Sequence, residues 1–411
     1  MTDFAEHRLS KWLLEEARYL GSIPEVLNGF CSALADEGFG IRRATLAMKT
    51  LHPQIEVLRY VWMDENIAAE KMDNPFVYHH DTYQFERGSC IETFLSFGCT
   101  TTAQLQKSPF WLLFEGRTSV YFKVNDEKTQ IQYPLFKELS AIGATTYFAT
   151  RLNNDEQNLH MMSLVSNNSD GFDKDQIAQL EQLIPILSLC LELKLQELVK
   201  TTLLDVYIGR TPGQKVLSGS IKPGDVERVE AAIWYSDLRN FTGLSNETKP
   251  HEMVTWLNEY FACLVESIYG CNGEVLKFVG DAMLAIFPVT ENVSSQKSCS
   301  EALSAAREAN RRLADWNEAR SNKRLPALKH GIALHYGEVL YGNVGGLKRL
   351  DFTVIGATIN LAARIEGLSS QLDVSLLASS SFVGYCDDAF EKAGEFEAKG
   401  FKKKIECYLP C

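Results

Sequence analysis

The 411-residue sequence lacks a basic excess, paired metal-binding cysteines and a long apolar run. Acidic residues outnumber basic residues by 53 to 41, which gives a formal net charge of −12. Because an acidic chain gains nothing from the electrostatics of a phosphate backbone, we expect no nucleic-acid partner. The ten cysteines are scattered without a CxxC pair, which favours reduced cytosolic thiols over a metal site or a disulfide framework.

Signals for export or membrane insertion are also missing. The first residues, Met-Thr-Asp-Phe-Ala-Glu-His, carry acids where a signal peptide carries bases. The most apolar run, 183–195, is short and contains Glu192 and Lys194, so we expect no membrane span. With 45% hydrophobic and 23% charged residues, the chain has the composition of a folded protein. We therefore expect a soluble cytoplasmic protein of two or three domains.

The first half of the sequence predicts an α+β domain. Two helices and then four strands are expected from apolar periodicity, at 9–20, 23–37, 43–49, 55–62, 145–152 and 160–166. His79, His80 and Asp81 are interpreted as a solvated loop. Adjacent histidines point in divergent directions, and no third metal ligand stands nearby.

A long helix is expected after Asp173, a plausible helix cap. Apolar residues recur at alternating spacings of three and four, at Ile177, Leu180, Ile184, Leu187, Leu191 and Leu198. This narrow seam is typical of a coiled coil, but its first half is equally compatible with packing on the helix's own domain. Pro185 is expected to kink or restart the helix. Glycine and proline crowd the stretch 209–224, which indicates a domain boundary.

The layout of this half resembles a GAF domain, a common bacterial small-molecule sensor. The resemblance lies in a sheet–helix domain whose last helix leads into an output domain, and in Gly171-Phe172-Asp173-Lys174-Asp175 at the start of that helix. It implies a GAF-like sensory domain at 1–175, with an unidentified small-molecule ligand. A helical linker or transducer would follow at 176–227.

Three segments of the second half carry residues suited to chemistry. A buried strand at 229–235 leads into Asp237, which alone could be a turn former or a helix cap. Two strands join at Gly280-Asp281, which alone could be an ordinary hairpin. A helix carries Asn360 and Arg364 one turn apart on the same face, a spacing that solubility alone can explain.

Together, and in this order, these segments resemble the class III adenylate and guanylate cyclase catalytic domain, over 228–411. The matching blocks are Ser236-Asp237-Leu-Arg-Asn-Phe-Thr242, Lys277-Phe-Val-Gly-Asp281, Gly331-Ile-Ala-Leu-His-Tyr-Gly337-Glu-Val and Thr353-Val-Ile-Gly-Ala-Thr-Ile-Asn360-Leu-Ala-Ala-Arg364. The resemblance implies a ferredoxin-like βαββαβ fold that converts ATP to 3′,5′-cyclic AMP and pyrophosphate. In that reaction the ribose 3′-hydroxyl attacks the α-phosphate, so the enzyme must position the substrate and stabilise charge.

The resemblance also assigns roles on the metal side of the site. Asp237 and Asp281 would bridge two Mg²⁺ ions, with Mn²⁺ as an alternative, and the carbonyl of Leu238 would complete a metal site. Backbone N–H groups around three following residues would meet the terminal phosphates; these are Asn240, Phe241 and Thr242. Many relatives have glycine at position 240, but asparagine tolerates the left-handed backbone of such a turn.

The remaining roles fall on the other side of the site. By the resemblance, Arg364 would stabilise charge on the α-phosphate and Asn360 would orient the ribose, both across a dimer interface. Because this chain has one cyclase block that contains both halves, we expect a homodimer with two shared sites. Lys402, in the basic cluster 399–404, would bind phosphate or would belong to a solvated strand edge.

The choice of base is argued from donors and acceptors. Lys277 can only donate and suits a ring nitrogen of adenine, and Thr353 can accept from its amine where many relatives carry Asp. Guanylate cyclases tend to place Glu at the lysine position, so ATP is the expected substrate. The departure at Thr353 also resembles a bicarbonate-responsive subgroup. A guanylate cyclase and a nucleotide-binding pseudo-cyclase remain as alternatives, although pseudo-cyclases usually lose a metal aspartate.

Overall fold

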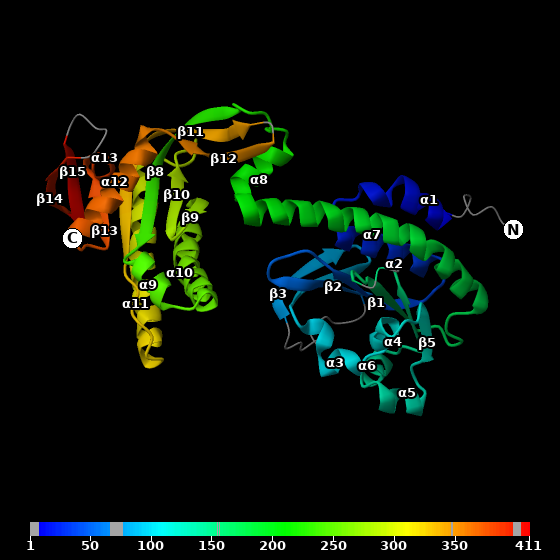
Figure 1. The fold of residues 1–411 in the computed structure, drawn as a ribbon. Coiled ribbons are helices and arrows are strands. Elements are labelled where there is room, and N and C mark those ends of the chain that lie inside the picture. The colour runs from blue at the N-terminus through cyan, green and yellow to red at the C-terminus, as the bar shows by residue number, and fades with distance from the viewer. Residues whose placement is uncertain (1–7, 66–76, 154, 156, 347, 398–403) are drawn as a thin grey trace. The chain divides into compact units, whose positions relative to one another are not determined.

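The computed structural model describes residues 8–65, 77–153, 155, 157–346, 348–397 and 404–411. The chain divides into two compact units, Met1–Leu203 and Leu204–Cys411. Each unit combines helices with its own sheet and core (Figure 1). The α+β fold class is therefore confirmed. No helix in the described ranges has the length and hydropathy needed to cross a bilayer.

Unit 1 is built on a seven-stranded sheet of order β3-β4-β2-β1-β7-β6-β5. Every neighbouring pair in it is antiparallel. The strands are β1 (Ile41–Lys49), β2 (Ile55–Met63), β3 (Val77–Phe85), β4 (Gly88–Ser96), β5 (Ser119–Lys123), β6 (Thr146–Arg151) and β7 (Met161–Ser166). The four strands predicted from alternation correspond to β1, β2, β6 and β7. The other three strands were not predicted.

Helices cover both faces of this sheet (Figure 1). One face packs against α1 (Arg8–Glu15), α2 (Ile23–Asp36) and the first part of α7 (Lys174–Ile208). Over the other face lie α3 (Ala103–Gln106), α4 (Phe110–Phe114), α5 (Glu127–Gln132) and α6 (Leu135–Ala141). Single 3-10 turns occur at Ala17–Tyr19 and Cys99–Thr101. The two helices predicted before β1 are confirmed as α1 and α2.

The interpretation of His79-His80-Asp81 as a loop is wrong, because the segment belongs to β3. The side chain of Asp81 is exposed, and the side chains of His79 and His80 lie outside the described part of the structure. Alternation was hard to recognise in this strand because it is rich in polar residues and pairs only with β4, at the edge of the sheet.

Helix α7 runs without interruption from Lys174 to Ile208, and the Asp173 carboxylate caps it by accepting the N–H of Gln176 at 2.7 Å. The expected restart at Pro185 is wrong. Pro185 is exposed, as is Glu181 one turn earlier. Water can therefore satisfy the carbonyl that loses its partner when proline takes this position.

The apolar seam of α7 packs mostly inside unit 1. Leu180, Ile184, Leu187 and Leu191 are buried in the core beneath α1 and α2. The coiled-coil interpretation of this first half is therefore wrong, and the alternative of packing on its own domain is right. Leu198, the last member of the seam, remains 39% exposed.

Unit 2 begins with α8 (Arg210–Leu217) and has a sheet of order β14-β15-β13-β11-β8-β10-β9, with β12 paired to β11. Its strands are β8 (Val226–Leu238), β9 (Glu274–Val279), β10 (Ala282–Pro288), β11 (His330–Gly346), β12 (Arg349–Ile355), β13 (Leu376–Ser379), β14 (Phe390–Phe396) and β15 (Ile405–Pro410). The central strands follow the order β11-β8-β10-β9. With the helices between them they give the expected βαββαβ succession.

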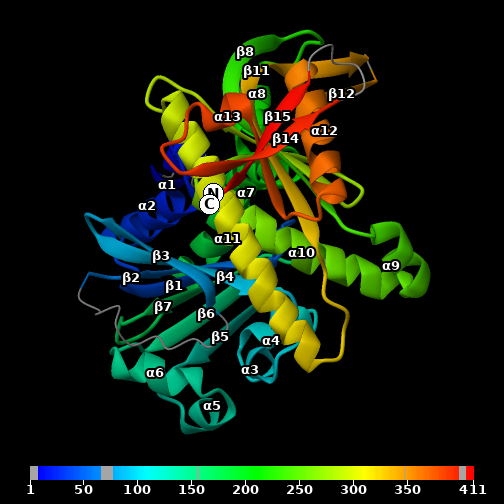
Figure 2. The same ribbon diagram turned by 90° about the vertical axis from the view of Figure 1, so that its left-hand side faces the viewer.

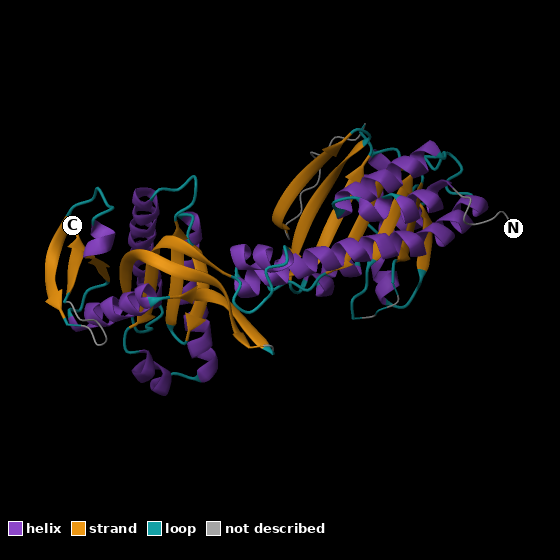
Figure 3. Cartoon of the chain, turned by 90° about the horizontal axis from the view of Figure 1, so that it is seen from above, coloured by secondary structure: helices purple, strands orange, loops and turns teal. Residues whose placement is uncertain are grey.

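Helices lie on both faces of the unit 2 sheet (Figure 3). Ala232 and Trp234 of β8 pack against α10 (Pro250–Gly270) and α11 (Ser295–Asn322). Ala231 and Ile233 point to the opposite face, beneath α12 (Ala357–Gln371). This alternation follows from the two-residue period of a strand. The short helix α13 (Ser380–Val383) lies beside β15 (Figure 2).

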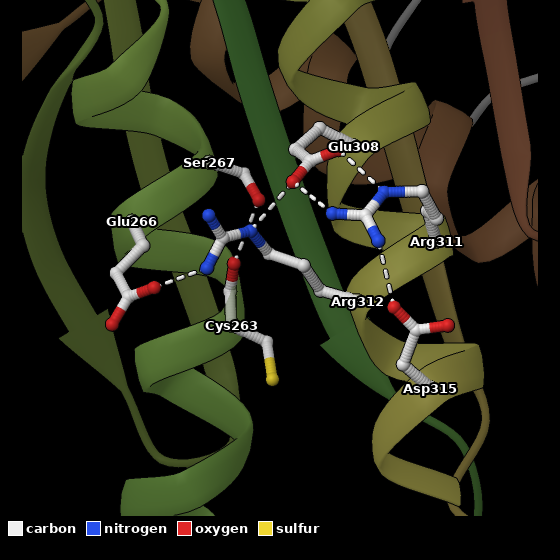
Figure 4. Close-up of polar contacts among 7 residues, drawn as sticks. All are labelled: Cys263, Glu266, Ser267, Glu308, Arg311, Arg312 and Asp315. Atoms are coloured by element: carbon white, nitrogen blue, oxygen red, sulfur yellow. Dashed lines mark hydrogen bonds and ion pairs between the residues drawn. The ribbon is translucent and has the colours of Figure 1, made fainter. Parts of the chain in front are cut away.

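A polar network joins α10 to α11 (Figure 4). Arg312 of α11 pairs with Glu266 of α10, and its Nε donates to Glu308 at 2.8 Å. Arg311 binds the same Glu308 at 2.6 Å. Because these charges are largely solvated, we expect the network to align the two helices and to add little to stability.

Two histidines of β11 make the stability of unit 2 depend on pH. His330 is 3% exposed and His335 is 8% exposed, and burial lowers the pKa of each to about 4. Between pH 6.5 and 4 the unfolded state takes up protons that the folded state excludes. We therefore predict that acidification through this window lowers the free energy of unfolding, by about 2 kcal/mol per histidine at pH 4.5.

Urea unfolding of the full chain at pH 7.0, 5.5 and 4.5 measures this loss. His335→Gln, which keeps a partner for the Ser379 hydroxyl that now lies 2.7 Å from Nδ1, should have a shallower pH dependence than the wild type. Equal slopes in the two proteins would contradict the prediction.

Candidate active site

The structure brings Asp237 and Asp281 together. Asp237 is the penultimate residue of β8, and Asp281 stands in the turn between β9 and β10. Strands β10 and β8 are antiparallel neighbours with Met283 opposite Ser236, so the hairpin turn reaches the level of the last residues of β8. Two carboxylates 44 positions apart in sequence thus meet at one end of the sheet.

The surroundings of these carboxylates favour a divalent cation. Burial, the nearby Asp281 and, more weakly, Glu366 raise the pKa of Asp237 to about 7. Its Oδ1 atom is buried and has no hydrogen-bond partner in the described part of the chain. A cation between the carboxylates would relieve their repulsion and satisfy this oxygen. The residues therefore fit Mg²⁺.

No group of three or more His, Cys, Asp or Glu side chains among the described residues is placed to hold a metal on its own. Mg²⁺ typically takes one or two carboxylates and completes its shell with water and substrate phosphates.

An ion pair between the segment after β8 and helix α12 lies next to the two carboxylates. Arg239 of the Ser-Asp-Leu-Arg segment lies 2.7 Å from Glu366 and 2.6 Å from the hydroxyl of Ser369, both on α12. Gly331 makes room for it, because a Cβ there would lie 2.0 Å from Nη2 of Arg239. Arg239 thereby compensates a carboxylate that would otherwise add to the charge of Asp237 and Asp281.

We did not predict this pair from the sequence. Glu366 stands two residues beyond Arg364, the last residue of one matching block. Arg239 stands two residues after Asp237, inside another matching block. A partner 127 positions away in the chain leaves no periodic signal. The sequence signal for this pair is that an arginine and a glutamate, which carry opposite charges, both stand in or next to the matching blocks.

Removing the arginine of this pair should destabilise unit 2. We predict that Arg239→Met lowers the free energy of unfolding by about 3 kcal/mol, because it leaves Glu366 buried without its counter-charge. Arg239→Met/Glu366→Gln should recover most of that loss. Chemical denaturation of both variants measures the difference, and a double variant no more stable than the single one would contradict the prediction.

The two residues proposed for base recognition lie on neighbouring strands. Lys277 is on β9 and Thr353 on β12, and these strands contact each other. The Lys277 ammonium makes a 2.6 Å ion pair with Asp351, two residues before Thr353 and therefore on the same face of β12. Thr353 is 8% exposed. Asp351 was missed in the sequence, although strand alternation places it beside Thr353.

The turn after β8 has the backbone that asparagine was expected to tolerate. Asn240 has φ 56° and ψ 30°, in the left-handed region, and precedes α9 (Phe241–Glu247). The Phe241 ring packs against the core under α10 and α11, and Thr242 is exposed. The side chain of Leu238 is buried in the same core. Lys402 lies outside the described residues.

Asn360 and Arg364 are on α12, one turn apart, and both are exposed. Neither side chain has a hydrogen-bond or ion-pair partner in the described part of the structure, whereas Glu366 on the same helix is buried and paired. This face of α12 therefore presents an amide and a guanidinium to whatever lies outside one copy of the unit.

The family described as "Adenylate and Guanylate cyclase catalytic domain" matches residues 226–410. Adenylate cyclase 1 of Rhizobium meliloti (strain 1021) is 31% identical over 185 residues, which are 44% of this chain and 27% of that protein. Adenylate cyclase of Anabaena cylindrica is 32% identical over 221 residues, which are 51% of this chain and 42% of that protein. The crystal structure of the adenylyl cyclase CyaB from P. aeruginosa is 23% identical with a TM-score of 0.42, and the match covers 45% of this chain and 95% of that one.

The chain thus spans less than half the length of these two curated relatives. The match coincides with unit 2, which holds Asp237, Asp281, Asn360 and Arg364. Residues 226–410 are therefore similar to the adenylate and guanylate cyclase catalytic domain.

Proposed function

We propose that this protein is an adenylate cyclase that converts ATP to 3′,5′-cyclic AMP and pyrophosphate. The observation that carries the proposal is the pair Asp237 and Asp281, in contact at the end of two central strands. The Oδ1 atom of Asp237 is buried and has no hydrogen-bond partner among the residues that the structure describes. That pair lies inside residues 226–410, which match the adenylate and guanylate cyclase catalytic domain family.

The chain's own groups divide the work of an internal phosphoryl transfer. Asp237, Asp281 and the Leu238 carbonyl would hold two Mg²⁺ ions, which when bound would neutralise phosphate charge and lower the pKa of the attacking hydroxyl. The N–H groups of Asn240, Phe241 and Thr242 bind the terminal phosphates, with a lysine such as Lys402 as a further phosphate ligand.

The α12 residues orient the substrate and stabilise the transition state. Asn360 fixes the ribose so that its 3′-hydroxyl faces the α-phosphate, and the Arg364 guanidinium stabilises the charge that builds there. We assign these two residues to the partner subunit's site, so that a homodimer holds two equivalent sites.

Exposed apolar side chains support the dimer. Phe278 and Val279, beside the Asp281 turn, are 50% and 52% exposed, and Ile355 at the end of β12 is 43% exposed. Apolar side chains gathered next to polar site residues are typical of a surface that a second subunit covers.

Two residues support ATP over GTP. Lys277 donates to a ring nitrogen of adenine and Thr353 accepts from its amine. The Lys277 ammonium lies 2.6 Å from Asp351 of β12, the strand that carries Thr353. The family description covers both adenylate and guanylate cyclases, so base choice depends on these side chains.

The test is a turnover assay with the full chain. Purified protein receives ATP or GTP with Mg²⁺ or Mn²⁺, with and without bicarbonate, and the products are separated by chromatography. Cyclic AMP as the main product supports the proposal. Cyclic GMP as the main product would make the protein a guanylate cyclase. Tight nucleotide binding without turnover would make it a pseudo-cyclase.

Unit 1 is assigned a sensory role, with α7 as the connection along the chain. A GAF-like domain at 1–175 would bind a small molecule, and the segment 176–227 would transmit the change to the catalytic pair. We predict that a chain starting at Val206 differs from the full chain in basal activity or in dimerisation. Sedimentation and turnover of both chains measure this, and identical values would contradict a regulatory role.

A further inference from the structure

Two arginines share the face of the unit 1 sheet that α3 to α6 cover. Arg43 is on β1 and Arg59 on β2, and the β1–β2 register places Ala47 opposite Arg59. Side chains alternate along a strand, so Arg43, Ala47 and Arg59 point to one face. Ala47 belongs to the core formed with α4 and α6, which identifies that face.

Arg43 and Arg59 are only partly exposed, and neither has a hydrogen-bond or ion-pair partner among the described residues. The Nε atoms of Arg43 and Arg59 are buried without a hydrogen bond, and no carboxylate of the described residues lies within ion-pair distance of either guanidinium. The neighbouring Arg42 of β1 pairs instead with Asp64 at 2.6 Å. Arg151, on the same face as Arg43, donates its Nε to the carbonyl of Leu113 at 2.8 Å.

The cost of this arrangement is electrostatic. Burial lowers the pKa of Arg43, and burial together with the charge of Arg43 lowers the pKa of Arg59 to about 10. Glu138 of α6 and Tyr147 of β6 oppose the shift at Arg43 only. Two like charges that are partly shielded from water and repel each other destabilise a fold unless an anion joins them.

The same face offers groups that suit an organic oxyanion. Thr93 stands opposite Arg59 across β2 and β4, and it is 1% exposed. Ser163 of β7 is 3% exposed and hydrogen-bonded to the Tyr147 hydroxyl. Val57 and Tyr147 add apolar surface. Guanidinium forks bind carboxylate and phosphate groups in a bidentate manner, and hydroxyls complete such sites.

We propose that Arg43 and Arg59 form a binding site for a small molecule that carries a phosphate or carboxylate group, between the unit 1 sheet and the layer of α3 to α6. This inference names the ligand class of the sensory domain and takes its regulatory meaning from the proposed function. Binding itself needs no catalytic turnover, so a failure of the cyclase assay leaves it standing.

The first test measures stability in the full chain, in chloride buffer free of other anions. Arg43→Met/Arg59→Met should unfold at a higher temperature than the wild type, because the double variant removes two partly buried like charges that repel each other and keeps similar side-chain volume. Arg42→Met is the matched control on the same strand, and it should unfold at a lower temperature because it breaks the pair with Asp64. A double variant that is destabilised as much as the control would overturn the proposal, since the arginines would then be structural.

The second test measures binding where the site is. Sodium phosphate and sodium succinate are titrated against sodium chloride of equal ionic strength, and hydrogen exchange is followed in peptides that cover 41–63. We expect one of the two oxyanions to slow exchange there, which distinguishes a phosphate from a carboxylate ligand. The apparent affinity should fall at least about tenfold in the double variant and remain unchanged in Arg42→Met. The proposal is overturned if neither oxyanion slows exchange. It is also overturned if the double variant and Arg42→Met bind the oxyanion with equal affinity.

Discussion

Asp237→Ala and Arg364→Ala are each expected to lower cyclase turnover at least about a thousandfold, and an equimolar mixture of the two to regain up to about a quarter of wild-type activity. Asp237 lies in the carboxylate pair, and Arg364 is exposed on α12 with no hydrogen-bond or ion-pair partner among the described residues. If the sites are shared, a mixed dimer combines one doubly altered site with one intact site. Half of the dimers in a random mixture are mixed, which gives one site in four.

The measurement is turnover of each variant alone and of the mixture, after subunit exchange has been verified by mass spectrometry of mixed dimers. Arg311→Ala is a suitable control, because Arg311 is an exposed arginine on α11 whose partners, Glu308 and Asp315, belong to the same helix. It should remain active alone. An exchanged mixture that stays inactive would contradict the shared site, and an active Arg364→Ala would remove that residue from catalysis.

Much of the fold was predictable because local patterns agree with the tertiary structure. Alternating apolar residues mark β1, β2, β6 and β7, and the apolar spacing of α1 and α2 gives their positions. Strand β3 resisted prediction since its pleat carries polar residues on both faces. The short helices α3 to α6 resisted it because each has fewer than eight residues and little periodicity.

The seam of α7 shows why periodicity alone does not identify a partner. A spacing of three and four places Leu180, Ile184 and Leu187 on one side of a helix, but it does not say which surface they meet. In this protein that surface is the unit 1 sheet and its helices. A second helix and an adjacent sheet bury such a stripe equally well, so only the tertiary structure separates the two.

The site divides in a similar way. Blocks of sequence located Asp237, Asp281, Asn360 and Arg364, because each block resembles a family pattern. Pairings between blocks were not predictable, since the Arg239–Glu366 and Lys277–Asp351 contacts join residues 127 and 74 positions apart. The arginines at positions 43 and 59 also escaped notice, because an arginine in a strand usually points to open solvent and only the fold shows that these two point to the sheet face that α4 and α6 cover.

Asp237→Asn is expected to stabilise the metal-free protein at pH 8 by about 1–3 kcal/mol while it lowers turnover by about a thousandfold. The pKa of Asp237 is raised from its ordinary value to about 7. Between pH 4 and 7 the folded state keeps a proton that the unfolded state releases, so the carboxyl loses stabilising effect as pH rises through this window. Above pH 7 the folded state must carry the buried charge beside Asp281, and an amide removes that cost.

Mg²⁺ should make the wild type more stable than Asp237→Asn, which is the reverse of the order expected without metal. A cation that binds the folded carboxylates stabilises the wild type in proportion to the logarithm of its concentration, whereas Asp237→Asn has lost one of the two ligands. Because protons compete for Asp237, the stabilisation by Mg²⁺ should weaken as pH falls below about 7. Urea unfolding at pH 8 and pH 6, with EDTA or with Mg²⁺, measures all four conditions, and Asp315→Asn on the exposed side of α11 serves as the control aspartate. If Mg²⁺ stabilised the wild type and Asp237→Asn equally, the cation would bind at another site, and Asp237 would not be a metal ligand of the reaction.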